Sequence, residues 1–72
     1  MALIEIETKR RLRREDAAAW LRDLADSLAR HNDVEFEQDG VRYEIAVPDE
    51  LEMELELEVG DDGTELEIEL RW

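Results

Sequence analysis

The chain of 72 residues is long enough for one small domain, and a domain of this size is marginally stable on its own. It has no cysteine and one histidine, His31, which excludes a disulfide framework and a zinc cluster built from cysteine and histidine. The formal net charge of −13 opposes binding to nucleic acid and to anionic membranes, so we expect neither as a partner.

Residues 3–12 alternate between apolar and mostly charged side chains, and we expect them to form the first strand. One face of this strand carries Ile4, Ile6 and Leu12. Arg10 interrupts the same face, and we expect it near the strand end, where its guanidinium group reaches water.

Residues 14–30 are expected to form a helix. Trp20 and Leu21 belong to a stripe of apolar side chains that recur at three- and four-residue spacing. Arg13 stands at the capping position in place of Ser, Thr or Asp, which weakens the start of the helix. Asn32 is the expected left-handed stop.

The rest of the chain predicts four further strands, at residues 34–38, 41–47, 51–59 and 64–72. Three turns connect them. Asp39-Gly40 is a strong signal for a two-residue hairpin turn, and residues 60–63 give a turn with two permissive glycines. Between these two, Pro48 is expected to turn the chain.

The turn lengths set the registers of the expected antiparallel meander. The first turn places Phe36 opposite Tyr43, and the turn at Pro48 places Tyr43 opposite Leu55. The last turn places Leu55 opposite Ile68. Every pairing sets an apolar side chain against another, which supports the meander.

The first strand can lie at either edge of this sheet. Antiparallel to the last strand, it would place Arg11 opposite Glu65 and Lys9 opposite Glu67, and such opposite charges favour this edge. Parallel pairing with the second strand is the alternative. We therefore expect a single α+β domain over residues 1–72, ordered β-α-β-β-β-β, with one helix on one face of a five-stranded, mainly antiparallel sheet.

One helix about 10 Å wide is too narrow to cover five strands spaced about 4.8 Å apart. An uncovered apolar patch of this kind usually marks an association site. We therefore expect a homodimer through the apolar sheet face, and the alternative is a sheet curled enough for the helix to cover it. The residues expected in the interface are Tyr43, Met53, Leu55, Leu66, Ile68 and Trp72.

The opposite sheet face is expected to be acidic, because glutamates alternate with the apolar residues of the last two strands. We interpret it as a hydrated surface screened by salt. The alternatives are weak, non-specific binding of divalent cations, which prefer oxygen ligands, and docking of a basic protein.

Residues 9–14 carry five of the nine basic side chains. We expect the acidic last strand to neutralise this basic run within the chain. The alternative is a patch that contacts the phosphates of nucleic acid. The arginines that would form such a patch are Arg10, Arg11, Arg13 and Arg14.

No arrangement of a nucleophile and a base can be assembled from this chain, which has no cysteine and no glycine-rich phosphate loop. His31 is expected as a cation at the negative end of the helix. The glutamates lie on an open face, whereas carboxylate catalysis needs a cleft that shifts their pKa values. We expect a non-enzymatic structural or interaction protein without a cofactor or a specific metal site.

The basic residues comprise eight arginines and a single lysine, Lys9. Surfaces rich in acid and poor in lysine are typical of proteins from a saturated-salt cytoplasm. At 1 M salt the Debye length is about 3 Å, so the repulsion among the carboxylates is largely screened. No signal-peptide layout and no membrane-spanning stretch is seen, and we expect a halophilic, cytoplasmic protein.

Three features together resemble the amphi-Trp domain family: Trp20-Leu21 in an alanine-rich acidic helix, Pro48 before a glutamate-alternating strand, and Trp72 after residues 66–70. The likeness covers almost the whole chain. It implies a small acidic protein of a kind common in halophilic archaea, with no established activity and no catalytic or binding residues to transfer. The basic run departs from the more usual Ser-Arg-Glu-Glu opening of the helix.

Overall fold

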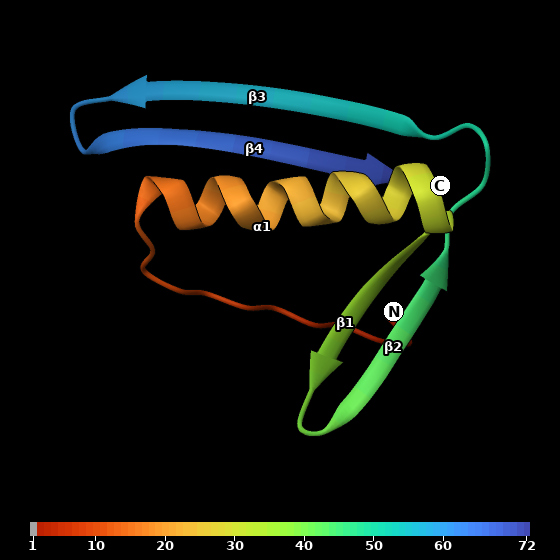
Figure 1. The fold of residues 1–72 in the computed structure, drawn as a ribbon. Coiled ribbons are helices and arrows are strands. Elements are labelled where there is room, and N and C mark those ends of the chain that lie inside the picture. Colours follow the sequence, from red (N-terminus) through yellow and green to blue (C-terminus); the bar gives the residue numbers. More distant parts are fainter. Residues whose placement is uncertain (1) are drawn as a thin grey trace.

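The computed structural model describes residues 2–72 and consists of one helix and two β-hairpins (Figure 1). The elements are the α-helix α1 (Arg14–Asp26), the π-helical turn η1 (Ser27–His31), and the strands β1 (Asp33–Gln38), β2 (Val41–Ala46), β3 (Glu52–Gly60) and β4 (Gly63–Arg71). Each hairpin is a separate two-stranded antiparallel sheet. The fold is α+β, but the expected five-stranded sheet is wrong.

The helix is entered through Arg13, which has an extended backbone and makes no capping hydrogen bond with its side chain. Its carbonyl oxygen accepts hydrogen bonds from the backbone N–H groups of Asp16 and Ala17, both at 3.1 Å. The last turn widens into η1 and ends at Asn32, whose φ of 55° confirms the predicted left-handed stop.

Both predicted hairpin registers are confirmed. In the first hairpin the turn residues 39–40 have positive φ angles of 54° and 78°, as a type I′ turn requires, and Phe36 lies opposite Tyr43. In the second hairpin Leu55 lies opposite Ile68. Local turn chemistry and the alternation of side chains therefore determine each hairpin separately.

The two hairpins do not join into one sheet because the chain does not turn back along β2 after Ala46. The backbone N–H of Val47 donates a hydrogen bond of 2.8 Å to the carbonyl oxygen of Asn32, so the end of β2 is bonded to the end of the helix. Pro48 follows and has no N–H to give to a strand ladder. The pairing of Tyr43 with Leu55, predicted from a turn at Pro48, is therefore absent.

Residues 2–13, here called the N-terminal arm, run extended but form no strand, which corrects the prediction for residues 3–12. Within residues 2–72, no backbone hydrogen bond joins the arm to a strand. The arm lies instead beside α1 and β1, where Thr8, Arg10 and Leu12 line an open cavity, and it does not reach β4, its expected partner. In Figure 1 the arm passes below α1, whereas the hairpin β3–β4 lies above it.

The protomer does not enclose a core of its own. Among residues 2–72, Val34 is the one buried hydrophobic residue, at 8% exposure. The accessible surface is 7193 Å², whereas a folded protein of 8.5 kDa exposes about 4,700 Å². The radius of gyration is 14.1 Å, compared with about 11 Å for a compact chain of this length. About 2,500 Å² of surface is therefore exposed beyond what a compact monomer would show.

Candidate association surface

The hairpin β3–β4 presents an apolar face that stays largely exposed within residues 2–72. Its cross-strand pairs set apolar side chains against one another, and apart from Leu70 each side chain of the face is between 52% and 73% exposed. We call this surface the apolar hairpin face; it consists of Met53, Leu55, Leu57, Val59, Leu66, Ile68 and Leu70. It includes four of the six residues predicted for a dimer interface, and Leu57 and Val59 extend the same alternation.

The other two predicted interface residues lie elsewhere. Trp72 follows β4 and is half-exposed, and its indole Nε1–H donates a hydrogen bond of 3.0 Å to the carbonyl oxygen of Ala46. This bond ties the end of the second hairpin to the end of β2. Tyr43 belongs to the first hairpin, where it is half-buried opposite Phe36.

Replacement of the terminal indole by a ring without a donor, Trp72→Phe, is expected to lower the free energy of unfolding by about 0.5–1.5 kcal/mol, the usual contribution of one hydrogen bond. Urea denaturation at a fixed protein concentration measures the effect. Tyr43→Phe is the matched control, because the Tyr43 hydroxyl makes no hydrogen bond within residues 2–72. Equal losses in the two variants would show that the bond to Ala46 contributes nothing.

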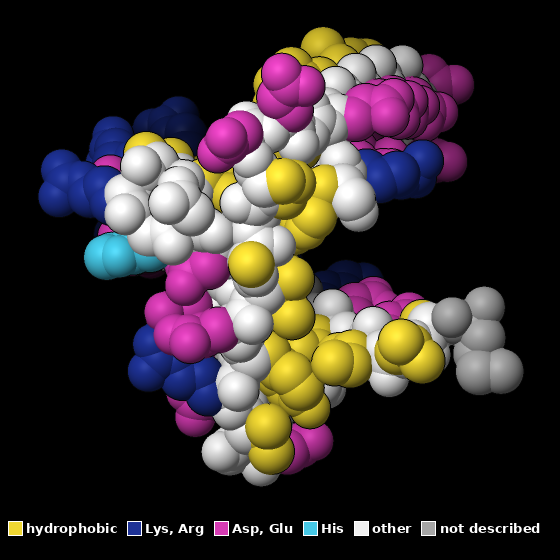
Figure 2. Space-filling view, turned by 90° about the vertical axis from the view of Figure 1, so that its right-hand side faces the viewer, with side chains coloured by type: hydrophobic (Ala, Val, Ile, Leu, Met, Phe, Trp, Pro, Cys, Tyr) yellow, Lys and Arg dark blue, Asp and Glu magenta, His cyan; other side chains and the backbone are white. Residues whose placement is uncertain are grey.

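A second apolar surface lies between the arm, α1 and β1, around an open cavity of about 600 Å³. Its lining residues are Thr8, Arg10, Leu12, Ala17, Trp20, Leu21, Glu35, Phe36 and Glu37. Figure 2 shows hydrophobic side chains gathered along the inner wall of a hollow, between the upper part of the molecule and the arm. The helical stripe that includes Trp20 and Leu21 was expected to pack on the sheet, whereas both side chains line this open cavity.

The acidic face of β3–β4 sets carboxylates directly opposite one another. The facing pairs are Glu54 with Glu69, Glu56 with Glu67 and Glu58 with Glu65. A side-chain hydrogen bond with Glu65 and the negative charges of Glu65 and Glu56 raise the pKa of Glu67. The folded hairpin therefore holds this proton more tightly than an unfolded chain, whose carboxyl titrates near 4.5.

The raised pKa of Glu67 sets the sign of a pH prediction. Its contribution to stability is fully present below about pH 4.5 and is lost as the pH rises through the folded-state pKa, because the ionised group is repelled. Glu67→Gln is therefore expected to raise the urea midpoint at neutral pH and low salt, and to leave it unchanged in molar salt. Glu52→Gln, whose site faces Arg71, is the matched control and is expected to lower the midpoint or leave it unchanged.

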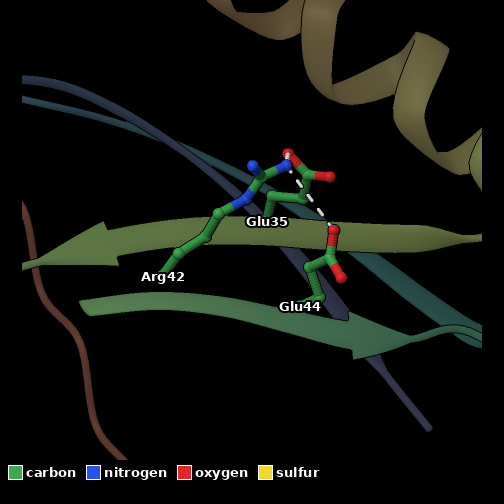
Figure 3. A network of polar contacts seen from close by, with 3 residues as sticks. All are labelled: Glu35, Arg42 and Glu44. Atoms are coloured by element: carbon green, nitrogen blue, oxygen red, sulfur yellow. Dashed lines mark ion pairs between the residues drawn. The ribbon is translucent and has the colours of Figure 1, made fainter.

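The first hairpin carries a mixed charge cluster, shown in Figure 3. Arg42 pairs with Glu35 at 2.8 Å and with Glu44 at 3.5 Å. Hydrogen bonds with Arg42 and then with Glu44 lower the pKa of Glu35. Asp33 brings a third carboxylate to within 4.8 Å of Glu35 and Glu44, but the guanidinium group of Arg42 already pairs with the two glutamates that a cation would use.

The basic run is spread out rather than gathered into a patch. Arg10 lines the cavity, Arg13 stands before the helix, and Arg11 is exposed. Arg14 is exposed as well and lies 3.6 Å from Glu15. In the part of the chain that the structure describes, no ion pair joins this run to β4, so the neutralisation predicted within the chain is not made.

These features define a class of small acidic α+β protein, in which amphipathic hairpins expose an apolar face and a terminal tryptophan anchors the last strand. The family model of the Amphi-Trp domain matches residues 1–72, so the chain belongs to the Amphi-Trp domain family, as the resemblance in the sequence implied. No curated protein and no solved structure matches the chain. Within residues 2–72, no helix has the length and apolar character needed to cross a membrane.

Proposed function

We propose that this protein is a non-enzymatic interaction module of a high-salt cytoplasm that works as an obligate homodimer through its apolar hairpin face. The observation that carries the proposal is the surplus of exposed surface, about 2,500 Å² per copy. If two copies cover this surplus on each other, the interface buries about 5,000 Å² in total. Interfaces of obligate homodimers fall in this range, and they resemble a domain core cut in half.

A second copy of the chain can cover the exposed apolar surface because it presents an apolar surface of the same size in return. The apolar hairpin face and the cavity wall that contains Trp20 and Phe36 are both open in each copy. A symmetric dimer can cover both surfaces of both copies at once. The dimer would carry a formal charge of −26, twice −13, and strong screening by salt is what makes such a particle stable.

Sedimentation equilibrium in molar potassium chloride tests the proposal. The expected mass is about 17 kDa, twice the 8.5 kDa of the chain, and the near-ultraviolet circular dichroism of the tryptophans should weaken as the dimer is diluted. A folded species of 8.5 kDa whose spectrum does not change with concentration would contradict the proposal.

A second candidate, docking of a basic protein on the acidic face, draws support from the facing carboxylate pairs. A cationic partner would relieve the repulsion that raises the pKa of Glu67. Reversal of charge at Glu54 and Glu56, both on β3, separates the two candidates. This change should abolish docking of a basic partner, whereas it should leave the mass of a homodimer held by the opposite face unchanged.

A further inference from the structure

The N-terminal arm has the form of a strand without a partner. Thr8, Arg10 and Leu12 all line the cavity, so alternate side chains of the arm point toward the helix and β1, as in an extended strand. No backbone hydrogen bond of residues 2–12 to a strand is found in the described part of the chain. An extended segment with free N–H and C=O groups is a template for pairing with another strand.

The outer edge of β4 offers a matching template. β4 pairs only with β3, so its other edge is open along all nine residues from Gly63 to Arg71. Residues 5–13 of the arm also number nine. By contrast, β1 and β2 have six residues each, and an arm of this length would overhang either of them.

The charges on the two segments are complementary in one antiparallel register. If Arg11 lies opposite Glu65, then Lys9 lies opposite Glu67. At the other end Glu5 meets Arg71, the one basic residue on β4. Cross-strand pairs of opposite charge stabilise a sheet.

The outer edge of β3 is a poorer match for the same arm. The outward side chains of β3 are glutamates throughout, at positions 52, 54, 56 and 58. They would repel Glu5 and Glu7 of the arm in either direction of pairing. On β4 one like-charge contact remains, between Glu7 and Glu69, against three attractive ones.

Within one chain the structure keeps these two segments apart. The arm lies below α1 and the hairpin β3–β4 lies above it in Figure 1, and the same separation is visible in Figure 2 as the hollow that opens between them. Hydrophobic side chains gather along the inner wall of this hollow, and the arm, whose Leu12 lines the open cavity together with Trp20 and Phe36, forms its lower side. A hairpin from another molecule that enters the hollow would meet the free edge of the arm and this wall together.

We propose that the hairpin β3–β4 of one copy enters the hollow of a second copy, where β4 forms an antiparallel ladder with residues 5–13. The exchange is reciprocal, so the dimer contains two such ladders related by a twofold axis. The apolar hairpin face then covers the cavity wall, and Lys9 and Arg11 gain Glu67 and Glu65 as acidic partners. This inference rests on the homodimer of the proposed function and specifies its geometry.

Engineered disulfides test the ladder, because the natural chain has no cysteine. Arg11→Cys and Glu65→Cys are prepared as separate proteins, unfolded together, refolded in molar potassium chloride and oxidised. The expected product is a covalent dimer of one Arg11→Cys chain and one Glu65→Cys chain. Glu7→Cys mixed with Glu65→Cys is the matched control, since four residues along a strand displace the thiols by about 13 Å, beyond the reach of a disulfide.

A cross-link in the 11/65 mixture that exceeds the one in the 7/65 mixture supports the ladder. In a chain with both changes, Arg11→Cys and Glu65→Cys, the ladder predicts a covalent dimer, and a disulfide within a single chain would overturn it. A dimer by sedimentation that forms no 11/65 cross-link overturns this inference and leaves the homodimer intact. A monomer by sedimentation overturns both.

Discussion

Replacement of Leu55 by glutamine is expected to raise the dissociation constant of the dimer by roughly 30- to 700-fold. Full burial of a leucine contributes about 1.5–3 kcal/mol. Leu55 is 62% exposed in the single chain, so its burial in the dimer contributes about 1–2 kcal/mol per copy to the free energy of association. Two copies contribute about 2–4 kcal/mol, which the substitution removes. Leu55→Gln also buries an amide group, which adds to the cost.

Sedimentation equilibrium over a dilution series measures this dissociation constant. Leu3→Gln is the matched control: the same chemical change is made at a side chain that is 98% exposed and lies outside the helix and the strands. It is expected to leave the constant unchanged. If Leu55→Gln and Leu3→Gln behave alike, the apolar hairpin face is not the interface.

Transfer from molar salt to about 0.1 M salt is expected to weaken the dimer and to destabilise its hairpins. The Debye length grows from about 3 Å at 1 M to about 10 Å at 0.1 M, so the repulsion between the facing carboxylates of β3–β4 is screened less. Each copy also brings a net charge of −13 to the association. The expected result is a rise in the concentration at which half of the chains are dimeric. Sedimentation equilibrium and tryptophan circular dichroism measure this concentration.

A variant that lacks part of the repulsion provides the control for this salt dependence. The triple change Glu54→Gln, Glu56→Gln and Glu58→Gln neutralises the β3 member of each of the three facing pairs. It is expected to remain dimeric at salt concentrations where the natural chain dissociates. Equal salt dependence in the two proteins would place the effect of salt outside the acidic face.

The parts of the fold that could be predicted from the sequence are those that local chemistry determines. Asp39-Gly40 accepts positive φ at both positions, so it fixes the register of the first hairpin. Asn32 ends the helix in the left-handed region, as predicted. The alternation of the last two strands correctly predicts their pairing, with Leu55 opposite Ile68.

The parts that could not be predicted are the long-range contacts. A strand with one apolar face needs a cover for that face, but its alternation does not say which element, or which molecule, supplies the cover. The turn expected at Pro48 assumed that β2 and β3 are neighbours, whereas the Val47 N–H bonds to the end of the helix. For the same reason the interface residues predicted around Leu55 and Ile68 lie together, while Tyr43 lies in the other hairpin.

The single shielded side chain, Val34, has a consequence for how the cell keeps this protein folded. In the proposed homodimer each chain completes its interior only with a second copy, so the folded fraction would depend by mass action on the concentration of the chain. At a low concentration the chains would be mostly monomeric and accessible to proteases, whereas at a high concentration the folded dimer would protect them. The rate of synthesis would then act as a threshold, below which the protein is cleared and above which it accumulates.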